Sequence, residues 1–477
     1  MRPVLDRLVV GVFALLWLLG CACAWNPATR RLDFNLVSEA EELELGRDND
    51  REVVAAAGLY EGDLAAYVLG IGERLAAVSE RPGLPWTFRL LDAPEVNAFA
   101  LPGGYVYVTR GIVAHLDSEA ELAAVLGHEI GHVTGRHGVV QYSRARVAQR
   151  SVGVLRVLDP GMRHVGAFAG ATAGLALLRH SRADEDEADL LALRYLGKAG
   201  YAPAAMGDVL GLLVYLATNQ GPREPMWLST HPEPADRAAT VAGELRRRGL
   251  ARDLGPDPAF LARLDGMIVG DDPRLGLVVG ERELWRPRAG YRLELPEGWS
   301  IEYDRTMAIA ADADGELALL VGPAEGDDLK AVEEAFLSSP SVRARERFTA
   351  VGPDFPATGG YFDFAGRSGQ LSGVVVFCDL GGSILVMMAA GAPARFAARK
   401  AEVEPIFATL RRLDPGLAAS VTPDRLALVR PESATPLAAL AGAPALAERS
   451  ARLNRLAASA VVEAEVTVKI VRPGRRP

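Results

Sequence analysis

The spacing of apolar and polar residues divides the chain into stretches of different character. An apolar run without charge covers 8–19, and residues 22–55 are polar and acidic. From 56 to about 270 the apolar residues recur mostly with helical spacing, interrupted at 86–110 by a segment typical of strands. We therefore expect this part to be mainly α-helical with a small β-sheet.

A different pattern, alternation with period two, begins near Trp285 and predicts strands. The alternating segments are 291–295, 316–321, 370–378 and 383–390. Helical spacing returns at 328–338 and 393–412, so we expect an α+β domain over 285–414. Pro415-Gly416 and Pro423 indicate a linker to a last small module, 424–477.

Composition and charge exclude several classes of protein. The 477 residues are 49% hydrophobic and 24% charged, which is ordinary for globular domains. Acidic residues outnumber basic ones by 61 to 52 and no Lys/Arg block exceeds three residues, so no nucleic-acid partner is expected. Three cysteines cannot build a disulfide framework, and Cys378 is expected to be a small core residue.

The N-terminal segment has the features of an export signal. Arg2 and Arg7 form a basic region before the apolar run. Leu18-Leu19-Gly20-Cys21 is typical of the site where a lipoprotein signal is cleaved. Residues 1–20 are therefore predicted to be a signal peptide, with Cys21 lipidated to anchor the chain. An uncleaved membrane helix is the alternative, but the polar Asn26-Pro27 favours the lipoprotein.

Candidate chemistry is concentrated in one part of the chain, because all seven histidines fall between 115 and 231. His128-Glu129-Ile130-Gly131-His132 lies in a predicted helix that begins at the capping box Ser118-Glu-Ala-Glu121 and stops at Gly138. Histidines at i and i+4 project from one helix face, so both can bind one tetrahedral Zn²⁺. Glu129 can then face a water and act as general base.

A third ligand has to come from elsewhere. The metzincin pattern HExxHxxGxxH fails by register, because His137 stands one residue early. The other source is a second helix, for which Ser181 is the predicted cap and Gly200 the predicted stop.

That second helix carries acidic residues one turn apart. Glu185 could bind the metal while Asp189 accepts a hydrogen bond from a ligand imidazole. Compensation of the helix dipole alone would also explain an acidic first turn. Spacing does not choose between Glu185 and Glu187 as the ligand.

Four segments together carry a family resemblance: Glu121-Leu-Ala-Ala-Val-Leu-Gly-His-Glu-Ile-Gly-His132, 96–111, Ser181-Arg-x-x-Glu-x-Glu-Ala-Asp189 and Thr230-His-Pro232. Over about 38–270 the chain resembles the zinc metallopeptidases of the BepA, HtpX and CAAX prenyl protease type, the gluzincins of peptidase family M48. The resemblance implies a zincin-type domain at 21–275, Glu185 as the third zinc ligand and Asp189 as the partner of a ligand histidine. The apolar run 165–178 is too short to cross a membrane, so the chain resembles the exported, lipid-anchored branch.

The resemblance also implies where substrate binds. Asn97, Ala98 and Phe99 lie in a predicted strand, 96–100, that pairs with 105–109 and resembles the family's edge strand beside the metal. An extended polypeptide would add to such an edge through main-chain hydrogen bonds. The residues alone are equally compatible with ordinary core strands.

His231 is the last candidate of the site. Pro232 favours an extended backbone at His231, which predicts a loop rather than a helix. The resemblance places this loop over the metal. From there the imidazole could donate to the developing oxyanion as a catalytic residue, or occupy the open zinc position and hold the enzyme latent.

The C-terminal parts give weaker indications. Residues 285–412 resemble the β-rich units with a Pro-x-Gly-Trp turn that accompany this protease branch, and they have no assigned chemistry. Residues 424–477 resemble a degenerate LysM module, in which Ser433-Ala-Thr435 replaces the usual Gly-Asp-Thr. Peptidoglycan or envelope proteins are therefore the partners expected for these domains.

The expected fold is thus multi-domain: a mainly α metallopeptidase domain with a small β-sheet, an α+β domain and a LysM-like module. The expected function is a zinc-dependent metalloendopeptidase at the periplasmic face of the bacterial envelope, lipid-anchored in the outer membrane. Its substrates would be exported, misfolded polypeptides. The alternative is an exported chaperone or binding protein with a latent or non-proteolytic metal site, against which Glu129 argues.

Overall fold

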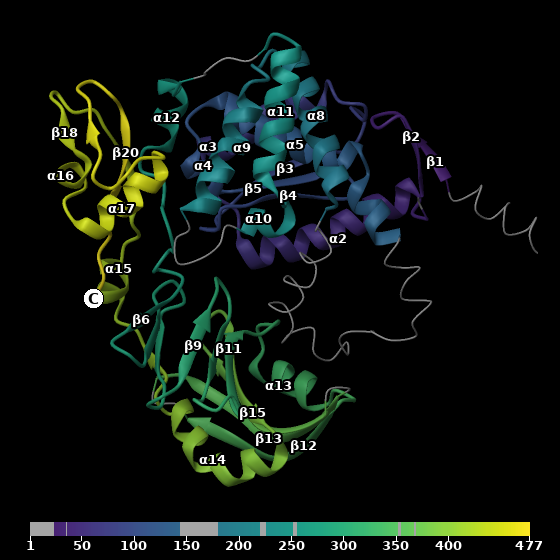
Figure 1. The fold of residues 1–477 in the computed structure, drawn as a ribbon. Coiled ribbons are helices and arrows are strands. Elements are labelled where there is room, and N and C mark those ends of the chain that lie inside the picture. The colour runs from purple at the N-terminus through teal and green to yellow at the C-terminus, as the bar shows by residue number, and fades with distance from the viewer. Residues whose placement is uncertain are drawn as a thin grey trace, which may run out of the picture. The chain divides into compact units, whose positions relative to one another are not determined.

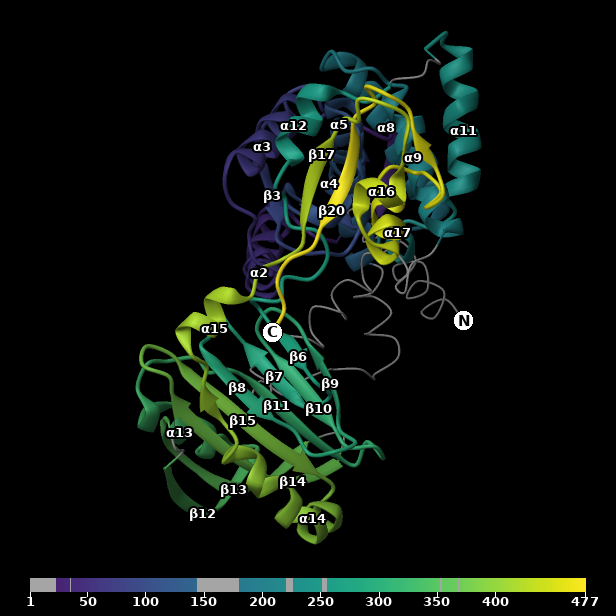
Figure 2. The same cartoon turned by 90° about the vertical axis from the view of Figure 1, so that its left-hand side faces the viewer.

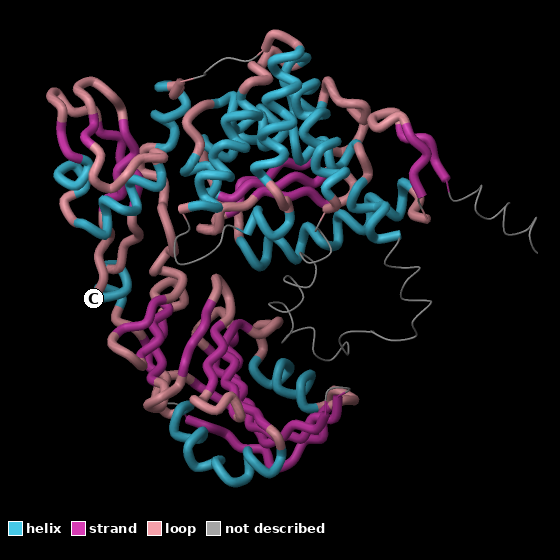
Figure 3. Tube along the Cα trace, in the orientation of Figure 1, coloured by secondary structure: helices cyan, strands magenta, loops and turns pink. Residues whose placement is uncertain are grey.

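The computed structural model describes residues 23–34, 36–143, 180–219, 226–250, 255–351, 354–366 and 369–477. They form two compact units (Figures 1 and 3). The first contains the described residues up to Gly270 and also Arg425–Arg472, and the second contains Asp271–Asp424 and Pro473–Pro477 as far as described. A helical region followed by an antiparallel β-rich region is confirmed. The domain boundaries given above stay predictions.

Three predictions concern segments outside the described residues. These are the signal peptide at 1–20, lipidation of Cys21 and the apolar run 165–178. Among the described helices, none combines the length and apolar character needed to span a bilayer.

The first unit contains a three-stranded sheet in the order β3-β5-β4. Strands β3 (Thr87–Leu91) and β5 (Tyr105–Thr109) run parallel, while β4 (Ala98–Leu101) pairs antiparallel to β5. Gly103 and Gly104 connect β4 to β5 at φ +83° and +97°, a backbone region that favours glycine. The strand-rich interruption is confirmed, and β4 is an edge of this sheet.

Helices surround the sheet in this unit (Figure 3). They are α2 (Glu39–Ala57), α3 (Asp63–Ala76), α4 (Arg110–His115), α5 (Glu119–Thr134), α8 (Arg182–Lys198), α9 (Ala205–Thr218), α10 (Met226–Thr230), α11 (Pro234–Arg247) and α12 (Pro258–Leu264), with a hairpin of β1 (Cys23–Asn26) and β2 (Arg31–Phe34). Buried residues of α3, α5, α8 and α9 share the main hydrophobic core with one face of the sheet.

Helix α2 begins well before residue 56, where the sequence pattern first predicted helices. Its buried positions are Glu42, Gly46 and Asp50, so it has no apolar stripe to reveal it. Asp50 attaches α2 to the sheet, because its carboxylate accepts two 2.7 Å hydrogen bonds from Arg89 and one of 2.8 Å from Tyr107. These polar contacts add to the packing of the partly buried Leu43, Val53 and Ala57 of α2.

The two helices of the predicted metal site begin where expected. Ser118 and Ser181 each cap a helix by accepting from the backbone N–H three residues on, and at Ser181 the full capping box forms with Asp184. The predicted stop at Gly138 is wrong: α5 ends at Thr134, because Arg136 has φ +56° and breaks the helix.

Helices α5 and α8 approach each other closely through small residues. A Cβ on Gly131 would lie 3.0 Å from the Ala188 carbonyl oxygen and 3.1 Å from its Cα. At Gly127 the corresponding distance to Ala192 Cα is 3.6 Å. Glycine at 131 is therefore needed for the two helices to lie side by side at this spacing.

Residues 425–472 pack against the helical unit rather than standing apart. Strand β17 (Arg425–Val429) pairs antiparallel with β20 (Val468–Arg472), with α16 (Leu437–Ala441) and α17 (Pro444–Leu453) between them in the chain, and β18 (Thr435–Pro436) pairs with β19 (Val461–Val462). Figures 1 and 2 show this segment in yellow beside α12. Leu426, Leu453 and Val471 join the main core of the unit.

Basic residues of this segment contact the start of α5. Lys469, only 1% exposed, places its Nζ 2.7 Å from Asp117 Oδ1 and donates to the Leu116 carbonyl at 3.1 Å. Arg455 donates to Glu121 at 2.7 Å. The sequence suggested a separate small module at 424–477 and gave no sign of this attachment to the metal-site helix.

The second unit is built on a seven-stranded antiparallel sheet in the order β12-β13-β14-β15-β11-β10-β9. Its strands are β9 (Ser300–Tyr303), β10 (Ala308–Ala311), β11 (Leu317–Pro323), β12 (Val342–Val351), β13 (Pro356–Gly366), β14 (Gly369–Asp379) and β15 (Ile384–Gly391). A smaller sheet contains β6 (Leu277–Val279), β7 (Glu283–Arg286), β8 (Tyr291–Glu294) and β16 (Arg411–Arg412).

Helices α13 (Leu329–Leu337) and α14 (Pro393–Phe407) pack on opposite faces of the larger sheet. On β14, Val376 and Cys378 face the α14 side while Phe377 faces the α13 side, as period-two alternation requires. Cys378 is buried, as predicted. Helix α14 ends before the predicted residue 412, because Arg411 and Arg412 pair with β8.

The contact between Lys469 and Asp117 gives a stability prediction. Asp117→Ala leaves the buried ammonium without its carboxylate and should destabilise the full chain by about 3 kcal/mol. Lys469→Met keeps the apolar stem, removes the charge and should cost less. Denaturant unfolding of both variants tests this, and an Asp117→Ala protein no less stable than Lys469→Met would contradict it.

Candidate metal centre

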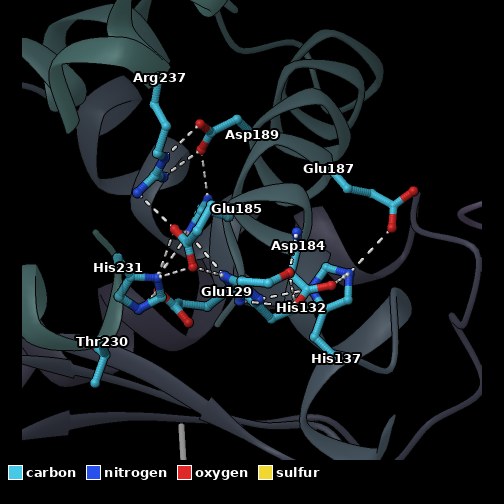
Figure 4. Close-up of polar contacts among 12 residues, drawn as sticks. Glu129, His132, His137, Asp184, Glu185, Glu187, Asp189, Thr230, His231 and Arg237 are labelled. Carbon is cyan, nitrogen blue, oxygen red and sulfur yellow. Dashed lines mark hydrogen bonds and ion pairs between the residues drawn. The ribbon is translucent and has the colours of Figure 1, made fainter. Parts of the chain in front are cut away.

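Four side chains from three parts of the unit meet at one buried point: His128 and His132 of α5, Glu185 of α8 and His231 after α10 (Figure 4). One ligand atom from each lies within 4.8 Å of all the others. All four residues are at most 3% exposed. The two histidines of α5 therefore meet the predicted third ligand and a fourth donor.

The separations of these atoms suit ligands of one ion. His128 Nε2 lies 3.0 Å from His132 Nε2 and 3.5 Å from Glu185 Oε2. His231 Nδ1 lies 3.3 Å from His128 Nε2 and 2.9 Å from Glu185 Oε1. Three imidazoles and one carboxylate at these spacings match the donor types and tetrahedral arrangement that zinc prefers.

The electrostatics of the site favour a cation. Burial alone would lower the pKa of His128, but Asp189 and Glu185 raise it to about 9. Burial likewise opposes ionisation of Glu185, yet His231 holds its pKa well below the usual value. Burial lowers the pKa of His132, so that imidazole is neutral and free to act as a ligand.

Behind the ligands, a buried arginine holds two carboxylates in place. Arg237 of α11 is 1% exposed and donates to both oxygens of Asp189, at 2.9 and 2.7 Å, while its third nitrogen lies 2.7 Å from Glu185 Oε2. Asp189 Oδ1 in turn lies 2.9 Å from His128 Nδ1, the ring nitrogen that points away from the ligand cluster. Burial opposes ionisation of Asp189, but Arg237 lowers its pKa.

Glu129 lies beside the donors without joining them. Its side chain is fully buried, and neither carboxylate oxygen has a hydrogen-bond partner among the described residues. Burial raises the pKa of this carboxyl, which makes it a stronger base. Its ion-pair contact is with His231, whose Nε2 lies 3.7 Å from Glu129 Oε1. A buried carboxylate without hydrogen bonds among the described residues, next to metal-type donors, fits a site that holds a metal and a reacting water.

Strand β4 lies near these donors. Ala98 and Phe99 belong to β4 and Asn97 directly precedes it, and all three side chains are buried. Phe99 stacks on Tyr107 at 4.7 Å, in a core cluster on the opposite face of the sheet from Ala98. A small hollow is lined by the end of this strand and by the site, with Ala100, Leu101, His132 and His180 among its residues.

Comparison with known proteins agrees with this geometry. The sequence profile of peptidase family M48 matches residues 64–245, which contain every donor described above. This part of the chain is therefore similar to peptidase family M48. The four-donor cluster lies inside the matched region, and its His/Glu composition is typical of the zinc site of that family.

Individual relatives share the same region. The putative beta-barrel assembly-enhancing protease of Vibrio cholerae serotype O1 is 34% identical over 259 residues, 51% of each chain. The beta-barrel assembly-enhancing protease of Yersinia pestis is 32% identical over 229 residues, 46% of this chain and 45% of that one. Mitochondrial metalloendopeptidase OMA1 of Schizosaccharomyces pombe is 32% identical over 220 residues, 45% of this chain and 64% of that one. The chain spans about half the length of the first two relatives.

Two residues at the metal centre, Arg237 and His180, received no role from the sequence. Arg237 stands alone in the first turns of α11, six residues after His231, and nothing local indicates that it is buried. His180 directly precedes the cap of α8, and its ring stacks on His132 with centroids 3.8 Å apart. The concentration of histidines within 115–231 was the available signal for His180.

Metal content distinguishes the two glutamates that spacing left open. Glu185 lies among the donors, whereas Glu187 Oε2 lies 3.3 Å from His137 Nε2 and contacts none of the four. Glu185→Ala, loaded with zinc and freed of excess, should retain well below one equivalent. Glu187→Ala removes none of the four donors and should retain far more zinc than Glu185→Ala. Elemental analysis of the purified proteins measures the zinc per chain. More zinc in Glu185→Ala than in Glu187→Ala would exclude Glu185 as the ligand.

Proposed function

We propose that the chain is a zinc-dependent metalloendopeptidase of the bacterial cell envelope that hydrolyses peptide bonds of exported, misfolded proteins. The observation that carries the proposal is the buried Glu129 beside the donor cluster, because neither of its carboxylate oxygens has a hydrogen-bond partner among the described residues. A site that binds a metal only for structure needs four closed ligands and no such base. The relatives named beta-barrel assembly-enhancing protease support the envelope as the place of action.

The residues of the site have different roles in the proposed peptide hydrolysis. His128, His132 and Glu185 would hold zinc, which when bound supplies Lewis-acid polarisation of a water and of the scissile carbonyl. Glu129 accepts the proton of the attacking water and returns it to the leaving amine. Asp189 and Arg237 keep the ligands oriented in a region without solvent.

The role of Glu129 gives the main test. Glu129→Gln should keep about one zinc per chain and lose roughly 10²- to 10⁴-fold in kcat, because the amide cannot accept the proton. Casein cleavage measured with and without a chelator is the assay, and Asp186→Asn on α8 is the matched control. A Glu129→Gln protein that still cleaves at the parent rate would disprove the mechanism.

His231 points its Nδ1 at the other donors, 2.9 Å from Glu185 Oε1, which supports the latent form over the oxyanion donor. The chain itself holds the histidine there, because His231 N–H donates to the Trp227 carbonyl at 2.8 Å. In the latent form the imidazole occupies the position that a reacting water needs.

Removal of this imidazole separates the two roles. His231→Ala should raise basal casein cleavage several-fold and keep its zinc, since three ligands remain. A lower kcat would instead indicate an oxyanion donor. Activity equal to the parent's across pH 5–8 in the zinc-loaded variant would exclude His231 from the site altogether.

Substrate would bind as an extended strand along β4, near Asn97, Ala98 and Phe99. The open edge of β4 and the hollow beside Ala100 and His132 support this placement. Binding through the main chain makes selectivity for sequence modest, which suits a protease that acts on misfolded polypeptides.

The remaining proposals concern location and partners. Lipidation of Cys21 would anchor the protein at the periplasmic face of the outer membrane. The order strand, two helices, strand over 425–472 supports the LysM-like assignment, with peptidoglycan or envelope proteins as partners.

Labelling tests the anchor. Cys21→Ala should stop incorporation of labelled palmitate and release the protein from the membrane fraction. Cys23→Ala is the control and should label like the parent. Labelling that persists in Cys21→Ala would show that the cleavage site has been assigned wrongly.

A further inference from the structure

A second group of histidines adjoins the metal centre. His132, His137 and His180 are buried, with ligand-type atoms within 4.8 Å of one another, and His132 belongs to both groups. The proposed zinc site uses one ring nitrogen of His132. The other nitrogen of His132 and the two further histidines remain to be explained.

The contacts form a chain that leads away from the metal site. His132 Nε2 faces His128 and Glu185, at 3.0 and 3.4 Å. Its other nitrogen, Nδ1, lies 2.9 Å from His137 Nδ1. His137 Nε2 then lies 3.3 Å from Glu187 Oε2, the contact drawn at the right of Figure 4.

The positions of the protons follow from this order. A ligand nitrogen carries no proton, so a neutral His132 that binds metal through Nε2 carries its proton on Nδ1. That N–H must donate to His137 Nδ1. His137 is then protonated at Nε2, and this N–H donates to Glu187. With neutral rings, this arrangement satisfies every contact in the chain.

A second metal ion held by the three histidines is the competing explanation. It would need His132 Nδ1 as a ligand and hence a ring without any proton, bridging two cations. The unpartnered Nδ1 of buried His180 would be the third donor. This arrangement demands an additional deprotonation that the chain of hydrogen bonds does not.

We propose that His137 and Glu187 are positioning residues that orient His132 and increase its basicity through a carboxylate–imidazole–imidazole relay. Asp189 does the same for His128 from α8, so both histidines of the motif would be fixed by carboxylates of one helix. Burial favours the relay, since His137 is 5% exposed and water cannot compete for its nitrogens. The proposal rests on the proposed zinc site, because it requires His132 to be a ligand.

Zinc affinity of the full chain, measured by competition with a chelator, tests the relay. Glu187→Ala and His137→Phe should each weaken zinc binding about 10- to 100-fold. The double variant should be no weaker than either single variant, because both break the same chain. Glu187→Gln should be partly rescued, since its amide oxygen still accepts from His137. Asp186→Asn, which removes a charge from the same helix, should match the parent.

The melting temperature of the metal-free proteins distinguishes a positioning role from a role in folding. If Glu187 is a positioning residue, its replacement should change the zinc affinity. The Glu187→Ala and Glu187→Gln apoproteins should then be equally stable. Zinc affinities of Glu187→Ala and His137→Phe within twofold of the parent would overturn the relay. So would two zinc equivalents in the parent that fall to one in His180→Phe. If the parent binds no zinc, or Glu185→Ala binds it normally, the proposed function fails instead.

Discussion

The close approach of α5 and α8 is the constraint on which the site depends. Because Gly131 has no side chain, the backbone of α5 lies so close to Ala188 that an added Cβ would stand only 3.0 Å from the Ala188 carbonyl oxygen. This contact places Glu185, one turn before Ala188, opposite His128 and His132. A methyl group at 131 would push the helices apart by some tenths of an ångström, which is enough to disturb a coordination sphere built on fixed bond lengths.

Such packing brings several charges into a region without water, and the chain compensates each of them locally. Two carboxylates, Glu185 and Asp189, share the guanidinium of Arg237, and all three side chains are at most 2% exposed. Fixed dipoles and charges then replace solvent around the reacting groups. Glu129 differs, because neither of its carboxylate oxygens has a hydrogen-bond partner among the described residues and its ion-pair contact with His231 Nε2 is 3.7 Å long. A carboxylate held without hydrogen bonds beside closely paired ligand supports favours the role of a base that we propose for Glu129.

Local signals allowed much of this to be predicted. The spacing of His128 and His132, the caps at Ser118 and Ser181 and the alternation through β14 all act within a few residues, so they can be read along the chain. What the pattern missed depends on distant contacts. Arg237 reaches the site only because α11 packs on α8. Helix α2 is attached to the sheet by the contact of Asp50 with Arg89, which no apolar stripe along the helix indicates. Spacing alone did not choose between Glu185 and Glu187 as the metal ligand, because both glutamates satisfy the same local rules. In the folded chain Glu185 lies beside His128, whereas Glu187 lies beside His137.

The contact of Lys469 with Leu116 joins positions 353 residues apart. During synthesis the residues around the start of α5 emerge long before their basic partners, and residues 271–424 of the second unit are made in between. Closing so long a loop is a late and slow step of folding. We therefore expect the N-terminal helical region to pass through an incomplete state until residues 425–472 arrive, so that the order of synthesis delays the completion of the helical unit that holds the metal site.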